Sequence, residues 1–324
     1  MILLILIILF LLYLLSWKLD FSRGQKPSWG ITFSQKYAEE LGLDFKKVYL
    51  DILNELKPEN LRLVAYWGYL EPEKGKFNFD DLDWQIKEAE KKNKKIILAI
   101  GHRVPRWPEC HQPDWTNSLN QENFQNSLLD YLKEVVNHYK SSPSIVTWQV
   151  ENEPLLSVFG QCPKPDRNFL KKEIELVKTL DPTRPILVTD SGELSLWLRS
   201  SGLSEIFGTT LYRIVWNKYI GWFRHLYPPV FFTLRANLVK KFSTTKEVMI
   251  IELQAEPWGV GARPITDIPF DQEIKHFDLK QFKSNLEFAK KTGIKQIYLW
   301  GAEWWYWRKT KGDDSFWQLA KSTF

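Results

Sequence analysis

The chain has 324 residues, of which 44% are hydrophobic and 26% are charged, and this balance excludes an intrinsically disordered protein. Its net charge of +5 arises from 44 basic and 39 acidic residues, and its densest basic run, at residues 91–95, directly precedes an apolar segment. That run is typical of a solvated helix-to-strand connection, so we predict no nucleic-acid partner.

The first segment, residues 2–17, is apolar and contains no charge, glycine or proline. As a helix it would be roughly 24 Å long, slightly less than the ~30 Å hydrocarbon core of a bilayer. A signal peptide would need a basic start and a small-residue cleavage site, and neither is visible. We therefore predict a transmembrane anchor at residues 1–17, with a signal peptide and a buried helix as the alternatives. A linker at 18–27 and one folded domain at 28–324 follow.

Eight short apolar runs come next, and amphipathic stretches with helical spacing separate them. The runs lie at residues 29–33, 61–67, 96–100, 145–150, 186–189, 207–212, 248–251 and 297–300. Continuous apolar runs are typical of parallel strands that are buried on both faces. The pattern predicts an α/β fold, a (β/α)8 TIM barrel, rather than an open doubly wound sheet, because no glycine-rich phosphate-binding sequence follows the first strand. The aromatic insertion at residues 213–241 has three open interpretations: a lid, a membrane-resting patch or a packed barrel helix.

Two of the predicted strands end in glutamate, at the edge of a barrel where active sites lie. The fourth ends in Glu151-Asn152-Glu153-Pro154, and Glu252 ends the apolar part of the seventh. Regular alternation would place both glutamates of the fourth strand on one side and the asparagine on the other. The proline would hold the residue before it in an extended conformation.

The segments "VENEP" and "MIIELQ" resemble the two catalytic motifs of the clan of retaining glycoside hydrolases with (β/α)8 barrels. Residues 61–83 also resemble the second-strand region of its cellulase-like, xylanase-like and β-galactosidase-like members. The resemblance implies that Glu153 is the general acid/base, that Glu252 is the nucleophile, and that the substrate is a β-linked oligo- or polysaccharide. Three other glutamates are weaker candidates for these roles: Glu151, Glu256 and Glu303.

Five further residues are predicted to bind substrate or to support the two carboxylates. Arg62 lies within an apolar strand and needs a buried partner, which would be the nucleophile or else a structural carboxylate. The resemblance implies that Asn152 binds the hydroxyl next to the anomeric carbon and that Tyr212 donates to the nucleophile. His102 and Trp300 end the third and eighth strands, where they would contact a hydroxyl and a sugar face. For each of these side chains a purely structural role is the alternative.

No metal-binding pattern is present in the sequence, and the predicted chemistry needs no cofactor. Cys110 and Cys162 fall in the loops after the third and fourth strands, so a disulfide is plausible outside the cytoplasm. A glycan-acting domain favours an extracytoplasmic location, although basic residues after the apolar segment weakly favour the opposite orientation. A non-catalytic carbohydrate-binding barrel and a transglycosylase are the alternative functions.

Overall fold

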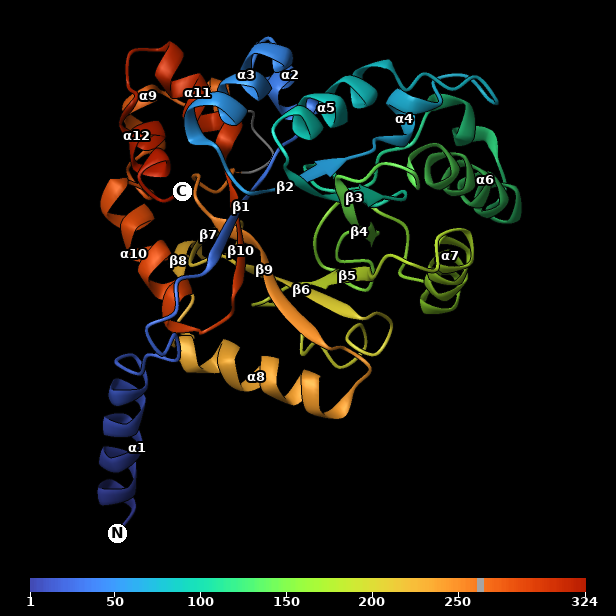
Figure 1. The fold of residues 1–324 in the computed structure, drawn as a ribbon. Coiled ribbons are helices and arrows are strands. Elements are labelled where there is room, and N and C mark those ends of the chain that lie inside the picture. The colour runs from blue at the N-terminus through green and yellow to red at the C-terminus, as the bar shows by residue number, and fades with distance from the viewer. Residues whose placement is uncertain (261–264) are drawn as a thin grey trace.

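The computed structural model describes residues 1–260 and 265–324, and eight parallel strands close into a barrel within it (Figure 1). Their order around the barrel is β1-β10-β9-β6-β5-β4-β3-β2. The strands are β1 (Ser28–Thr32), β2 (Asn60–Val64), β3 (Lys95–Ile100), β4 (Ile145–Val150), β5 (Ile186–Asp190), β6 (Ile206–Leu211), β9 (Glu247–Gln254) and β10 (Gln296–Trp300). Each of the eight apolar runs forms one of these strands, so the predicted barrel is confirmed.

The amphipathic stretches form the helices that surround the barrel. The longest are α5 (Asp80–Lys91), α6 (Gln121–Tyr139), α7 (Arg167–Leu180), α8 (Pro229–Phe242) and α10 (Leu279–Lys291). Shorter ones are α2 (Gln35–Glu40), α3 (Phe45–Asp51), α4 (Trp67–Leu70), α9 (Phe270–Glu273), α11 (Ala302–Thr310) and α12 (Ser315–Lys321). The helices α6, α7 and α10 begin after Asn120, Asp166 and Asp278, whose side chains accept hydrogen bonds from backbone N–H groups of the first turn.

The apolar core has two layers. A large cluster fills the space between the strands and the helices, and a smaller one fills the barrel interior with Ile97, Leu187, Met249, Ile251 and Tyr298. The strands are thus buried on both faces, as continuous apolar sequence requires.

The aromatic insertion divides into two parts. Its first part is a hairpin of β7 (Ile214–Asn217) and β8 (Gly221–Arg224), and its second part is the helix α8, which contributes Phe232, Ala236 and Val239 to the core. The interpretation as a packed barrel helix is therefore confirmed for α8.

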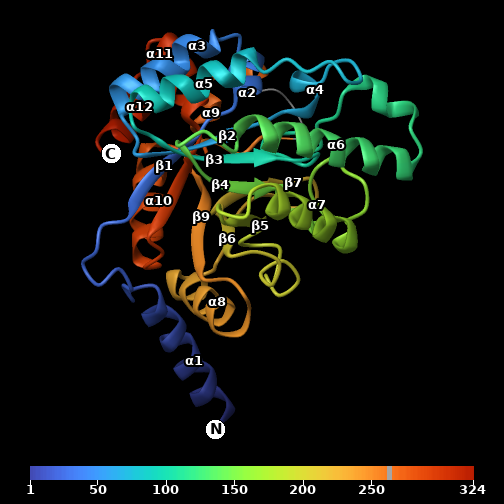
Figure 2. The same cartoon turned by 45° about the vertical axis from the view of Figure 1, so that its right-hand side comes forward.

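The N-terminal helix α1 (Ile2–Ser16) projects away from the barrel and has no buried residue (Figures 1 and 2). The Tyr13 hydroxyl donates to the Leu226 carbonyl at 3.0 Å, and Phe21 in the predicted linker donates its N–H to the Lys291 carbonyl at 3.0 Å. Over residues 1–260 and 265–324, no helix combines the length and apolarity that crossing a bilayer demands. With 15 residues α1 reaches only about 22 Å, so the predicted transmembrane anchor finds no support.

Candidate active site

The chain turns sharply where β4 ends. Glu151 and Glu153 both have left-handed backbone conformations, with φ of 60° and 47°. Such angles are uncommon for residues other than glycine. The predictions of regular alternation and of an extended Glu153 are therefore wrong.

Hydrogen bonds stabilise this turn, and they explain why two glutamates adopt a backbone conformation that residues other than glycine usually avoid. The Glu151 carboxylate accepts the backbone N–H groups of His102 and Arg103 at 2.7 Å each, and the Glu153 N–H donates to Thr189 Oγ1 at 2.7 Å. Left-handed backbone costs free energy and persists where its surroundings fix it. At Gly101, with φ of 128°, an added Cβ would lie 2.3 Å from Glu151 Oε1, so only glycine leaves room for this carboxylate.

Arg62 links the ends of three strands. Its side chain is fully buried and donates from Nη1 to Glu252 Oε1 at 2.7 Å, from Nη2 to Asn152 Oδ1 at 2.8 Å and from Nε to Gln149 Oε1 at 2.8 Å. All three nitrogen atoms of the guanidinium thus donate a hydrogen bond. The structure places Arg62 against Glu252, as the sequence predicted, and against Asn152 as well.

Glu252 receives a second donor from Tyr212, the residue that directly follows β6. The Tyr212 hydroxyl lies 3.1 Å from Glu252 Oε2, the oxygen that Arg62 does not contact. Both carboxylate oxygens therefore accept hydrogen bonds, one of them from a cation, and this stabilises the anion that a nucleophile must be.

Glu153 is surrounded differently from Glu252. Burial raises its pKa well above the usual value, and the negative charges of Glu252 and Glu109 raise it further. A raised pKa favours the protonated carboxyl group, which is the form that a general acid needs.

Comparisons with known proteins agree with this geometry. The sequence profile described as Glycosyl hydrolase family 10 matches residues 26–162, which include the segment from β1 to Glu153 but not Glu252. The chain is 26% identical over 136 residues to the β-galactosidase LacZ of Lactobacillus acidophilus, which covers 36% of this chain and 20% of that protein. It is 28% identical over 127 residues to a probable mannan endo-1,4-β-mannosidase F of Aspergillus flavus, which covers 36% of this chain and 26% of that protein. The chain thus matches about a quarter or less of the length of these relatives.

Solved structures share the fold. The xylanase 10B of Thermotoga petrophila, in complex with xylobiose, aligns with a TM-score of 0.57 at 16% identity over 85% of this chain and 82% of that one. A protein titled GH5_18 from Streptomyces cattleya, in complex with GlcNAc, aligns with a TM-score of 0.54 at 14% identity over 85% of this chain and 70% of that one. The chain is therefore similar in part of its sequence to glycoside hydrolases and shares the (β/α)8-barrel fold of these structures.

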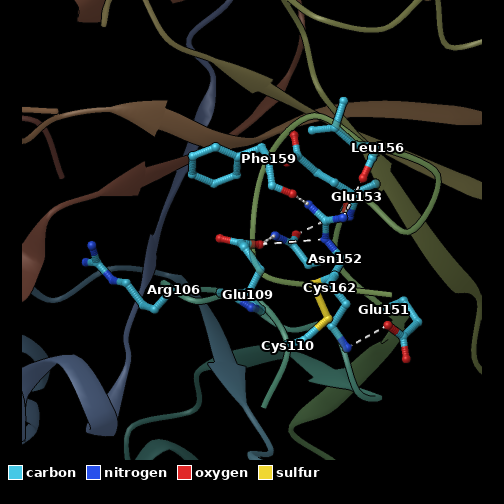
Figure 3. A network of polar contacts seen from close by, with 12 residues as sticks. Arg106, Glu109, Cys110, Glu151, Asn152, Glu153, Leu156, Phe159 and Cys162 are labelled. Carbon is cyan, nitrogen blue, oxygen red and sulfur yellow. Dashed lines mark hydrogen bonds and ion pairs between the residues drawn. A yellow bond between two sulfur atoms is a disulfide. The ribbon is translucent and has the colours of Figure 1, made fainter. Parts of the chain in front are cut away.

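In this barrel a third carboxylate joins the site, and sequence reasoning missed it. Glu109, in the loop after β3, is buried, and its Oε2 accepts from Asn152 Nδ2 at 3.1 Å (Figure 3). Burial and then the charge of Glu252 raise the pKa of Glu109 to about 7. Its backbone φ of 76° and its position beside the Cys110–Cys162 disulfide fix it in place, and the predicted disulfide is confirmed. The neighbouring cysteine was a sequence signal that marked this loop.

The loop after β3 also contains Arg106, whose side chain extends across the barrel mouth. Its guanidinium pairs with Glu256 and with Glu303, and it lies 3.7 Å from the Tyr37 ring centre and 4.1 Å from that of Trp300. Two of the weaker glutamate candidates are therefore engaged in a structural ion-pair cluster. Trp300 is at the barrel mouth as predicted, but Arg106 stacks on its ring.

His102 contacts neither Glu153 nor Glu252 through a hydrogen bond in the described part of the chain. Its ring packs edge-on against Phe124 at 5.0 Å, and its backbone binds Glu151 instead of Glu153. Of the seven predicted site residues, the structure links Arg62, Asn152, Tyr212 and Glu252 in one network, with Glu153 close to it. The remaining two are Trp300, under Arg106, and His102.

A row of aromatic rings leads from the surface to this network. Trp107, which is 43% exposed, lies 5.8 Å from Phe159; Phe159 lies 5.5 Å from Trp258; and Trp258 lies 5.1 Å from Tyr212. Such rings offer apolar faces to the C–H surfaces of sugars.

Proposed function

We propose that this chain is a retaining β-glycosidase in which Glu153 is the general acid/base and Glu252 is the nucleophile. One observation carries the proposal: both carboxyl groups lie at one barrel mouth, where Glu252 accepts hydrogen bonds from a buried cation and a tyrosine and Glu153 is buried beside negative charge. Arg62 and Tyr212 stabilise the Glu252 anion, while burial and neighbouring charge keep the proton on Glu153.

In the first step Glu153 gives its proton to the glycosidic oxygen, the bond between that oxygen and the anomeric carbon breaks, and Glu252 forms an ester with that carbon. Because the ester carries no charge, the main electrostatic cause that raises the Glu153 pKa disappears. Glu153 then acts as a base, takes a proton from water, and the water oxygen displaces Glu252.

The relatives support a β-linked substrate class. They include a β-galactosidase, mannan endo-1,4-β-mannosidases and an endo-1,4-β-xylanase. We infer that this chain cleaves β-linked oligo- or polysaccharides.

The test is hydrolysis of p-nitrophenyl β-glycosides, xylan and mannan by the wild-type chain and by Glu252→Gln. We expect turnover by the wild type and a loss of at least about 10⁴-fold in kcat in the variant. Glu247→Gln, at the opposite end of β9, is the matched control and should remain active. Equal turnover by wild type and Glu252→Gln would refute the assignment, and product analysis with added sugar acceptors would reveal a transglycosylase.

We also propose that α1 attaches the barrel to a lipid surface outside the cytoplasm. The helix is apolar on all sides and exposed, and α8 presents the apolar stripe of Leu234, Leu238 and Phe242 to solvent. The disulfide is typical of an oxidising compartment. The full chain should float with phospholipid vesicles, and the double variant Leu6→Asp/Leu9→Asp should not; flotation of both, or of neither, would contradict the proposal.

A further inference from the structure

A cavity of about 520 Å³ lies outside the catalytic network. The loops after β3 and β4 enclose it together with α6 and α7, which pack side by side (Figure 2). The Cys110–Cys162 disulfide lines it and lies between Glu109 on the catalytic side and Glu151 on the cavity side (Figure 3). The proposed reaction therefore uses none of the carboxyl groups of this cavity.

Two buried carboxyl groups line the cavity. Glu151 accepts hydrogen bonds from two backbone N–H groups of the loop after β3, and Glu173 on α7 is 2% exposed. Burial raises the pKa of Glu151, and burial together with the charge of Glu151 raises the pKa of Glu173 well above its usual value. The protonated, uncharged form of Glu173 is therefore favoured.

Polar atoms in this lining are left without partners. Glu173 Oε1 and His102 Nε2 are buried and have no hydrogen-bond partner in the part of the chain that the structure describes. Burial lowers the pKa of His102 to about 4, so the imidazole is neutral. An unsatisfied buried polar atom costs about 1–3 kcal/mol, which a bound ligand with hydroxyl groups would recover.

The rest of the lining combines aromatic rings with amides. Phe124 and Phe169 are half-buried in it, and Gln112, Asn117, Gln121 and Gln125 contribute their amide groups. Neutral hydrogen-bonding groups together with flat apolar rings match the hydroxyls and the C–H faces of a sugar. The volume is within the usual range of small-ligand pockets, about 300–1,000 Å³.

We propose that this cavity is a second saccharide-binding site, separate from the catalytic mouth, which holds part of a glycan while another part is cleaved. The choice of a sugar as ligand rests on the proposed function. Because Pro154, which follows Glu153, also lines the cavity, a chain bound there lies near the acid/base residue. Two sites on one glycan raise the effective concentration of the scissile bond.

The test uses the full chain with Glu252→Gln, titrated calorimetrically with xylotriose, mannotriose and cellotriose. We expect two equivalents of at least one trisaccharide to bind. Adding Phe169→Ala or Gln125→Ala should remove one equivalent or weaken it at least tenfold. Asn126→Ala, on the same helix as Gln125 but outside the cavity, is the matched control and should retain both.

In the catalytically intact chain, Phe169→Ala should hydrolyse p-nitrophenyl glycosides as the wild type does and should cleave the polysaccharide several-fold more slowly. Binding of one equivalent or none for all three probes would overturn the inference, as would two equivalents that persist in both cavity variants. Loss of binding in the cavity variants together with no hydrolysis by the wild type would support this site and refute the proposed function. A Tm of Gln125→Ala equal to that of the wild type would show that any loss of binding is not caused by a folding defect.

Discussion

Replacement of Arg62 by methionine would test how much this buried cation contributes to the stability and the activity of the protein. The substitution keeps an apolar stem of similar shape but removes a fully buried cation that contacts Glu252, Asn152 and Gln149 at 2.7–2.8 Å. Breaking a buried ion pair by deleting one partner costs about 3–5 kcal/mol. At about 2–4 °C per kcal/mol, the Tm should fall by about 6–20 °C.

Catalytic activity should fall together with the Tm, because the buried Glu252 carboxylate would lose the cation that accompanies it. The loss of charge-assisted hydrogen bonds worth about 3 kcal/mol corresponds to about 10²-fold in kcat/KM. The measurements are thermal unfolding by circular dichroism and hydrolysis of an aryl β-glycoside at pH 6.

Two companion variants separate stability from chemistry. Arg308, also buried, pairs with Glu273 at 3.1 Å and Asp313 at 2.7 Å on the outside of the barrel, so Arg308→Met should lower the Tm and spare kcat. In Arg62→Met/Glu252→Gln the Tm should partly recover, because no buried charge is left alone. A Tm of Arg62→Met within 2 °C of the wild type, or activity above a third of it, would refute this reasoning.

Three further outcomes are expected. Tyr212→Phe should lower kcat about 10–100-fold with little change in Tm, because it removes one donor to Glu252; an unchanged kcat would contradict that role. Glu109→Gln should move the basic limb of the pH–rate profile to lower pH, because the charge of Glu109 helps to raise the Glu153 pKa. A basic limb that stays in place or moves to higher pH would contradict this role of Glu109. Glu173 has a raised folded-state pKa, so it stabilises the fold below its unfolded pKa and loses this contribution as pH rises. The free energy of unfolding of Glu173→Gln, relative to that of the wild type, should therefore be higher at pH 9 than at pH 5. If urea unfolding gives the same difference between the two proteins at both pH values, this effect is excluded.

The barrel and the position of Glu153 and Glu252 at its mouth could be predicted from the sequence because both are local signals. Apolar runs mark strands that are buried on both faces, and a glutamate at the end of such a run must lie at the barrel mouth. Arg62 was predictable for the same reason, since a cation inside an apolar strand requires a buried partner.

The conformation of loops was beyond such reasoning. The left-handed turn at Glu151 and Glu153 depends on N–H groups that come from the loop after β3, about fifty residues earlier in the chain. Arg106 and Glu109 enter the mouth only because that loop folds inward, and His102 is turned away for the same reason. No local pattern encodes contacts between segments so distant in sequence.

The turn after β4 has a consequence for which changes of chain length this protein tolerates. With a single residue between them, Glu151 lines the cavity beside α6 and α7, whereas Glu153 does not. Insertion or deletion of even one amino acid between Val150 and Pro154 would change the spacing between these two carboxyl groups. Length variation among kindred chains should therefore occur outside these five positions, for example near Val158, which is 71% exposed.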